Sequence, residues 1–187
     1  MHVADAQREV RVVFAGGFFG QAVSSVLWAL SAALSTWGSR RLGMLVLVFG
    51  GALIFPATQL ILRTLGRRAS LSDDNPLGQL AMQIAFTIPL NLLVAGGATL
   101  YRVTWFYPAC MIVVGAHYLP FVHLYGMRQF WVLGALMVAA GVAFALYLPG
   151  PFSLGAWVTA GLLMVFAFVG RAAVTSEPEP RIVKELA

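Results

Sequence analysis

Apolar and polar positions form long blocks along this chain: apolar runs of about 20 residues alternate with short polar segments. A helix needs about 20 apolar residues to cross a bilayer. Helices suit lipid because they pair their backbone N–H and C=O groups internally. The pattern therefore predicts an all-α, polytopic transmembrane helical bundle. Its roughly six spans are expected at residues 12–36, 42–62, 76–101, 104–125, 128–148 and 152–170.

The polar segments define how the chain is organised around these spans. Residues 1–171 read as one membrane domain, and residues 172–187, with a Glu-Pro-Glu-Pro run, as a disordered cytoplasmic tail. Asn75 followed by Pro76 is typical of a helix start and predicts where the third span begins. The first apolar run, residues 12–36, is too long for the core of a signal peptide, so we interpret it as a retained span.

Composition excludes a soluble protein, because 60% of the residues are hydrophobic and only 10% are charged, against about 25% in soluble domains. The net charge of +5 does not indicate nucleic-acid binding, since the basic residues stand alone or in short clusters between apolar runs. Six spans put most of them on one side: Arg8, Arg11, Arg63, Arg67, Arg68, Arg128, Arg171, Arg181 and Lys184. The other side holds Arg40, Arg41 and Arg102. This bias predicts that both termini are cytoplasmic and that membrane lipids are the surrounding partners.

Several kinds of chemistry lack their usual residues. No Asp, Glu or Lys lies in a predicted span, whereas acid–base catalysis and proton-coupled transport usually use buried carboxylates. Cys110 is the only cysteine, which excludes an internal disulfide and a CxxC site. Hydrolase, zinc-protease and phosphate-loop motifs are missing as well. We therefore predict no catalytic residue, metal or cofactor.

Neutral polar side chains form stripes on two spans. In the third span, Gln79, Gln83, Thr87 and Asn91 recur every four residues and so share one helix face. In the first span, Gln21 and Ser25 share a face. Such residues either hydrogen-bond between helices or line a hydrated pathway. We expect Gln83, Thr87 and Asn91 to face the bundle interior, because an amide turned to lipid loses its partners.

His117 stands near the middle of the fourth span, three residues before Pro120. An imidazole can ligate a metal or haem, carry protons or simply hydrogen-bond. No other predicted span offers a histidine for paired haem ligation. We expect His117 to bond a Gln, Ser or Thr of span one or three, without metal. The aromatic residues near span ends predict an interfacial belt: Trp105, Phe106, Tyr107, Trp131 and Trp157.

Two motifs carry a family resemblance. The stretches Trp105-Phe-Tyr-Pro-Ala109 and Val114-Gly-Ala-His-Tyr-Leu-Pro-Phe121 resemble a family of small bacterial integral membrane proteins of unknown function. The resemblance extends to about Tyr147 and implies a multi-pass protein of the bacterial inner membrane. It implies no activity, substrate or site.

Three classes of function remain open. We predict first a channel or transporter for a small neutral or weakly polar solute, along a route lined by spans one, three and four. The solute-binding residues would be Gln21, Ser25, Gln83, Thr87, Asn91, His117 and Tyr118. The alternatives are an intramembrane enzyme acting on a lipid or quinone-like substrate with His117 as base, and a non-catalytic scaffold or sensor subunit. A dry, tightly packed centre would favour the scaffold. The oligomeric state stays open.

Overall fold

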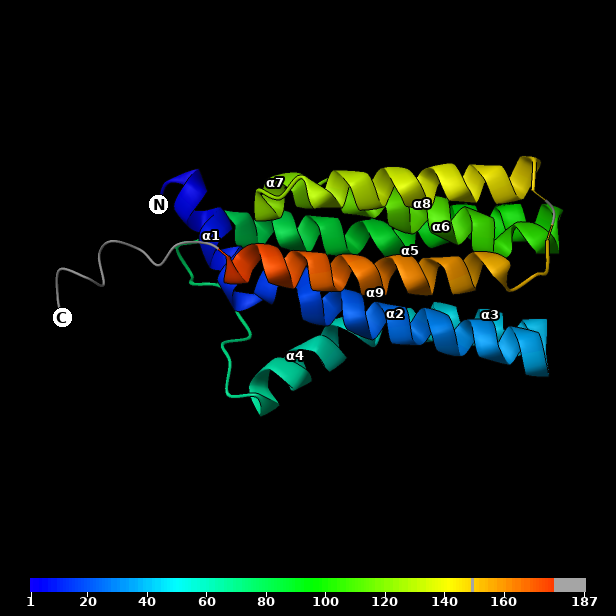
Figure 1. Cartoon of the computed structure of the whole chain (residues 1–187), viewed down its shortest axis with the longest axis horizontal. Helices are drawn as coiled ribbons and strands as arrows, with labels where there is room; N and C mark the ends of the chain where they lie inside the picture. Colours follow the sequence, from blue (N-terminus) through cyan, green and yellow to red (C-terminus); the bar gives the residue numbers. More distant parts are fainter. Residues whose placement is uncertain (149, 177–187) are drawn as a thin grey trace, which may run out of the picture.

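The computed structural model describes residues 1–148 and 150–176, and the regular elements of these residues are helical (Figure 1). The helices are α1 (Val3–Val13), α2 (Phe18–Ala33), α3 (Arg40–Gly51), α4 (Ile54–Thr64), α5 (Leu77–Tyr101), α6 (Phe106–Tyr118), α7 (Phe121–Tyr125), α8 (Gln129–Leu146) and α9 (Leu154–Thr175). Three short segments join them: η1 (Ala15–Gly17), the π-helical η2 (Leu34–Gly38) and η3 (Val103–Trp105).

The predicted all-α bundle of about six spans is confirmed. Five helical stretches are long and apolar enough to cross a membrane, and the pair α3 and α4, bent by 58°, makes a sixth when it is counted as one broken span. The N-terminus and the end of α9 lie at the same end of the bundle, as an even number of spans requires (Figure 1). The chain is a multi-pass helical membrane protein. α9 continues to Thr175, and residues 177–187, most of the predicted tail, lie outside the described residues.

Proline accounts for two breaks within spans, because it donates no backbone N–H and clashes with the preceding turn. α6 ends at Tyr118 and α7 begins directly after Pro120. The bend between α3 and α4 lies within one turn before Pro56. Pro89, in contrast, lies inside the continuous helix α5.

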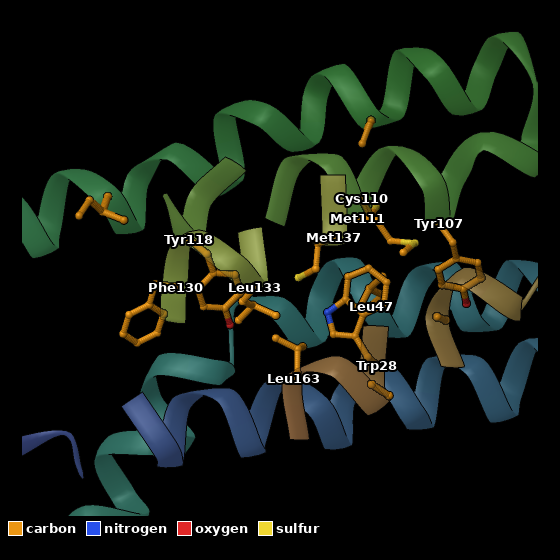
Figure 2. Packing of buried hydrophobic residues seen from close by; sticks show 14 of the residues in the cluster. Trp28, Leu47, Tyr107, Cys110, Met111, Tyr118, Phe130, Leu133, Met137 and Leu163 are labelled. Carbon is orange, nitrogen blue, oxygen red and sulfur yellow. The ribbon is translucent and has the colours of Figure 1, made fainter. Parts of the chain in front are cut away.

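The centre of the bundle consists of two close helix pairs, α2 with α9 and α6 with α8. Gly115 and Gly134 let α6 and α8 approach, since a Cβ on either would lie 2.9 or 2.7 Å from the carbonyl oxygen of the other. Figure 2 shows the apolar centre between these pairs, including Trp28, Met111 and Met137, all at most 3% exposed. α5 packs on α6, and α4 leans away from the bundle (Figure 1).

A sharp kink joins α1 to α2. Ala15, Gly16 and Gly17 have φ values of 48°, 65° and 86°, a left-handed conformation that favours glycine. A side chain on Gly16 would also collide with the backbone carbonyl of Gly170 in α9. The kink therefore sets α1 off from the first span and fixes where α2 begins.

The sequence pattern did not predict α1, an amphipathic helix that covers the end of the bundle where the N-terminus lies. It buries Ala6, Val10 and Val13. Its polar side chains reach α7, where Gln7 Nε2 donates to the His123 carbonyl at 2.6 Å and Arg11 Nη1 to the Tyr125 carbonyl at 2.7 Å. We call α1 the cap helix.

The Glu9 carboxylate ties the cap helix to the loop before α5. It accepts hydrogen bonds from Ser72 N and Ser72 Oγ, both at 2.7 Å, and from Asn75 Nδ2 at 2.8 Å. Arg68 lies 3.4 Å away. Asn75 Oδ1 also accepts from Leu77 N at 2.9 Å, which confirms that Asn75 and Pro76 start the third span. One loop thus both begins α5 and holds the cap helix.

We expect the cap helix to loosen in acid. Partial burial raises the pKa of Glu9, but the hydrogen bonds from Asn75 and Ser72 and the charge of Arg68 outweigh it and hold the pKa below its ordinary value of 4.5. A depressed pKa stabilises the fold above the unfolded-state pKa, and this stabilisation is lost as the pH falls through the folded-state value. The protection of the α1 amides against hydrogen exchange, corrected for the intrinsic exchange rate at each pH, should therefore fall in wild type as the pH drops below 4.5.

The variant Glu9→Gln should show fast exchange in α1 already at neutral pH, because the charged hydrogen bonds, worth about 1–2 kcal/mol in total after allowing for solvent exposure, are missing. Asp5→Asn, at an exposed position of the same helix, is the control and should behave like wild type. Exchange in Glu9→Gln that keeps the pH dependence of wild type would refute this role of Glu9.

Candidate functional site

The predicted solute-binding residues lie in three places. Gln21 and Ser25 are buried on α2, His117 and Thr87 meet between α6 and α5, and Gln83 and Asn91 point outward from α5. Tyr118 is buried on α6, and its ring stacks on that of Phe130 with centroids 6.1 Å apart. The described structure therefore does not gather all seven residues around one pocket.

Gln21 lies in the first turn of α2, directly after the left-handed kink, and is only 2% exposed. Neither its amide nitrogen nor its amide oxygen has a hydrogen-bond partner among the described residues. Ser25, one turn later, differs because its hydroxyl donates to the Ala160 carbonyl of α9 at 2.7 Å. One polar residue of this face is thus satisfied within the chain, and the other is not.

An aromatic cluster borders this region on the side of the cap helix. A Cβ on Gly17, one turn before Gln21, would lie 3.1 Å from the Phe130 ring and 3.8 Å from the Tyr125 ring. The rings of Tyr125 and Phe130 lie 4.8 Å apart, and those of Tyr118 and Phe121 5.3 Å apart. We call Tyr118, Phe121, Tyr125 and Phe130 the aromatic cluster. It lies at the break between α6 and α7.

His117 bonds Thr87 of the third span, which agrees with the predicted bond to a Gln, Ser or Thr of span one or three. Its Nδ1 lies 3.1 Å from Thr87 Oγ1, whose hydroxyl is 2.7 Å from the Ile84 carbonyl. When the hydroxyl donates to the Ile84 carbonyl, which can only accept, His117 donates from Nδ1 to Thr87 Oγ1. In this tautomer Nε2 is unprotonated and carries a lone pair inside the bilayer.

The expectation that Gln83 and Asn91 face the interior is wrong, since both are exposed and only Thr87 of the stripe is half-buried. Asn91 Nδ2 donates to the Thr87 carbonyl of its own helix at 2.9 Å. Recurrence every four residues places side chains on a common stripe but does not reveal which way the stripe points. In lipid the outer face of a helix is as apolar as the inner one, so the sequence gave no further indication of which face of α5 points into the bundle.

A hydrogen-bond network at the opposite end of the bundle escaped the sequence interpretation. Tyr107 is fully buried, and its hydroxyl lies 2.7 Å from both Ser31 Oγ and Ser35 Oγ. Thr36 of the π-helical segment donates to Ser153 at 2.7 Å. The belt interpretation was therefore wrong for Tyr107, whose ring is inside the bundle (Figure 2). The spacing of one turn between Ser31 and Ser35 was the sequence signal that could have predicted this network, because it places both hydroxyls on one face of the helix.

A cavity of about 130 Å³ opens beside this network. Phe152 links the two, because its ring is part of the cavity wall and lies 5.0 Å from that of Tyr107. Arg102 and Trp105 form part of the wall, with the guanidinium 5.4 Å from the indole centroid. In the part of the chain that the structure describes, no three His, Cys, Asp or Glu side chains lie together as a metal site would need.

The comparison with known families gives one match. Residues 3–172 fit the model of a family described as a family of unknown function (DUF7010). No curated protein and no solved structure matches the chain. The matched region runs from the cap helix through nearly all of α9, and it agrees with the resemblance to a membrane protein family without an assigned activity. The chain therefore belongs to the DUF7010 family.

Proposed function

We propose that this protein is a passive or weakly coupled transporter for a small uncharged solute with both a hydrogen-bond donor and an acceptor. Gln21 is the observation that carries the proposal, because its whole amide is buried without a partner among the described residues. Burying an unbonded amide costs about 2–7 kcal/mol. A species from outside the chain, water or solute, offsets this cost when it binds there.

The charge pattern selects a neutral solute. No Asp or Glu lies within the spans, so a cation would meet no countercharge there, and the arginines of the spans, such as Arg171, lie near the span ends. The Gln21 amide offers one acceptor oxygen and two donor hydrogens, which suits an amide or polyol. His117 Nε2, with its lone pair, and the Tyr118 hydroxyl are further neutral contacts in the same half of the bundle.

Interrupted helices support the proposal, because broken spans often frame transport sites by freeing backbone groups and by serving as hinges. Gln21 follows the left-handed kink, Tyr118 precedes the break at Pro120, and α3 with α4 bends by 58°. The aromatic cluster separates Gln21 from the cap helix, which bonds α7 through Gln7 and Arg11. In this proposal the described structure is a closed state, in which the cap helix blocks one end of the solute route. Release of the cap helix from α7 opens the route.

We place the protein in the cytoplasmic membrane of a bacterium with both termini inside. The bias of basic residues supports this orientation, and the motif resemblance supports the location. Reporter fusions at Gly38, Gly150 and the C-terminus test the orientation. A fusion at the C-terminus that reports the outer side would contradict it.

A solute flux assay tests the function. Purified protein in liposomes is mixed with hyperosmotic urea or glycerol, and vesicle reswelling is followed by light scattering. We expect protein-dependent reswelling with at least one of the two probes and none with sodium chloride, because the sodium ion finds no countercharge within the spans. Reswelling equal to that of empty vesicles for both probes would refute the transport proposal.

An intramembrane enzyme with a lipid or quinone-like substrate is the second candidate. The free Nε2 lone pair of the half-buried His117, beside the peripheral helix α5, favours it, because a general base needs such a nitrogen within reach of the bilayer. Turnover of an extracted membrane lipid that disappears in His117→Phe, without solute flux, would support this candidate over transport. A scaffold or sensor subunit would show neither flux nor turnover.

A further inference from the structure

The outer face of α5 carries amides where a lipid-facing helix is normally apolar. We define this outer face by Gln83, Leu90, Asn91 and Val94, all exposed, with Leu90 and Val94 each 67% exposed. Asn91 lies near the middle of the 25 residues of α5, so its side chain is deep in the hydrocarbon. α5 packs mainly on α6 and is the least buried of the spans.

Both amides keep polar atoms without a partner among the described residues. Asn91 donates once, to the Thr87 carbonyl of its own helix, and the described ranges hold no other hydrogen bond of its side chain and none of the Gln83 side chain. Amide atoms left unbonded in lipid are costly, so their presence on one face points to another polar surface against α5.

We infer that the outer face of α5 binds the same face of a second copy of this chain. Both copies insert with one orientation, so a two-fold axis along the membrane normal sets each residue opposite its own equivalent at the same depth. Gln83 then faces Gln83 of the partner, and Asn91 faces its own equivalent. An amide is both donor and acceptor, so it pairs with itself, whereas an unrelated helix would need polar groups at two matching depths.

The surroundings of the amides suit a close helix contact. Leu90 lies between them in the sequence, and Val94 is one turn further along the same face. Gly97 follows one turn after Val94 and two turns after Leu90, and a Cβ there would meet nothing within 4 Å, so it presents a flat surface to a partner helix. The interface is separate from Gln21, and its failure would leave the transport proposal intact.

Cysteine cross-linking in membranes tests this inference. In a Cys110→Ala background, Leu90→Cys reports on the proposed interface, and Val165→Cys, 59% exposed on α9, is the matched control. Oxidation should convert Leu90→Cys to a dimer at least ten times faster than Val165→Cys, in native membranes and in proteoliposomes diluted with lipid. Equal rates, a monomer at all dilutions, or an adduct whose mass includes another protein would overturn the inference.

Removing the amides should weaken the same dimer. We expect the double variant Gln83→Leu with Asn91→Leu to raise the dissociation constant in bilayers about tenfold, since each interhelical hydrogen bond in a membrane contributes about 0.6 kcal/mol. Gln59→Leu removes an amide from α4 and should leave the constant unchanged. An unchanged constant in the double variant would also overturn the inference.

Discussion

Replacing Gln21 with leucine should reduce solute flux about tenfold or more while leaving the fold as stable as wild type or more stable. The reduction in flux arises because the variant loses its hydrogen bonds to the solute, which are worth about 1–3 kcal/mol. The gain in stability arises because leucine has a similar size and carries no amide that must be buried without a partner. Vesicle reswelling and unfolding in mixed micelles measure the two effects on the same preparation.

Thr159→Val is the matched control for this prediction. Thr159 is also fully buried, but its hydroxyl donates to the Gly155 carbonyl of its own helix at 2.8 Å. Its replacement should cost about 1 kcal/mol of stability and leave flux within twofold of wild type. If Gln21→Leu instead unfolded more easily and transported normally, Gln21 would be a structural residue.

Gly134→Ala should destabilise the bundle by about 2–3 kcal/mol, the second large effect that we expect. The added methyl group would lie 2.7 Å from the Gly115 carbonyl oxygen and 3.0 Å from Leu119, so α6 and α8 would have to separate. These two helices form one of the two close pairs at the centre, and their separation would loosen the apolar cluster around Met137. Unfolding monitored by tryptophan fluorescence in mixed micelles measures the loss.

Gly161→Ala provides the comparison, because a Cβ at this exposed position of α9 meets nothing within 4 Å. Alanine is a better helix former than glycine, so this variant should be neutral or gain up to about 1 kcal/mol. A similar response of the two variants would show that helix propensity, and not the close approach of α6 and α8, decides the outcome.

The spans were predictable because their length and apolarity follow from the thickness of the bilayer alone. Both ends of α5 were predicted within one residue, from Asn75 and Pro76 at its start and from the apolar run itself. The cap helix was not predicted, since its polar face hides the short apolar stripe of Ala6, Val10 and Val13. The position of the cap helix depends on contacts with segments distant in the sequence, such as Ser72 and α7.

The site was predictable only in part. The position of His117 in the sequence predicted a bond to a Gln, Ser or Thr of span one or three, because a polar residue in lipid needs a polar neighbour, and the structure gives Thr87 as that partner. The outward direction of Gln83 and Asn91 was not predictable, since periodicity fixes a stripe and not its direction. That Gln21 lacks a partner, while Ser25 on the same face has one, depends on where the Ala160 carbonyl of α9 happens to lie.

Thiol accessibility at position 21 measures most directly whether molecules from outside reach the buried amide. Gln21→Cys in a Cys110→Ala background is treated with a small neutral thiol reagent in proteoliposomes. Wild type serves as the reference, because its Cys110 is 1% exposed within the apolar core. We predict that Cys at position 21 reacts at least tenfold faster than Cys110 and is protected by the transported solute. A rate no faster than that of Cys110, with or without solute, would contradict a solute route through Gln21.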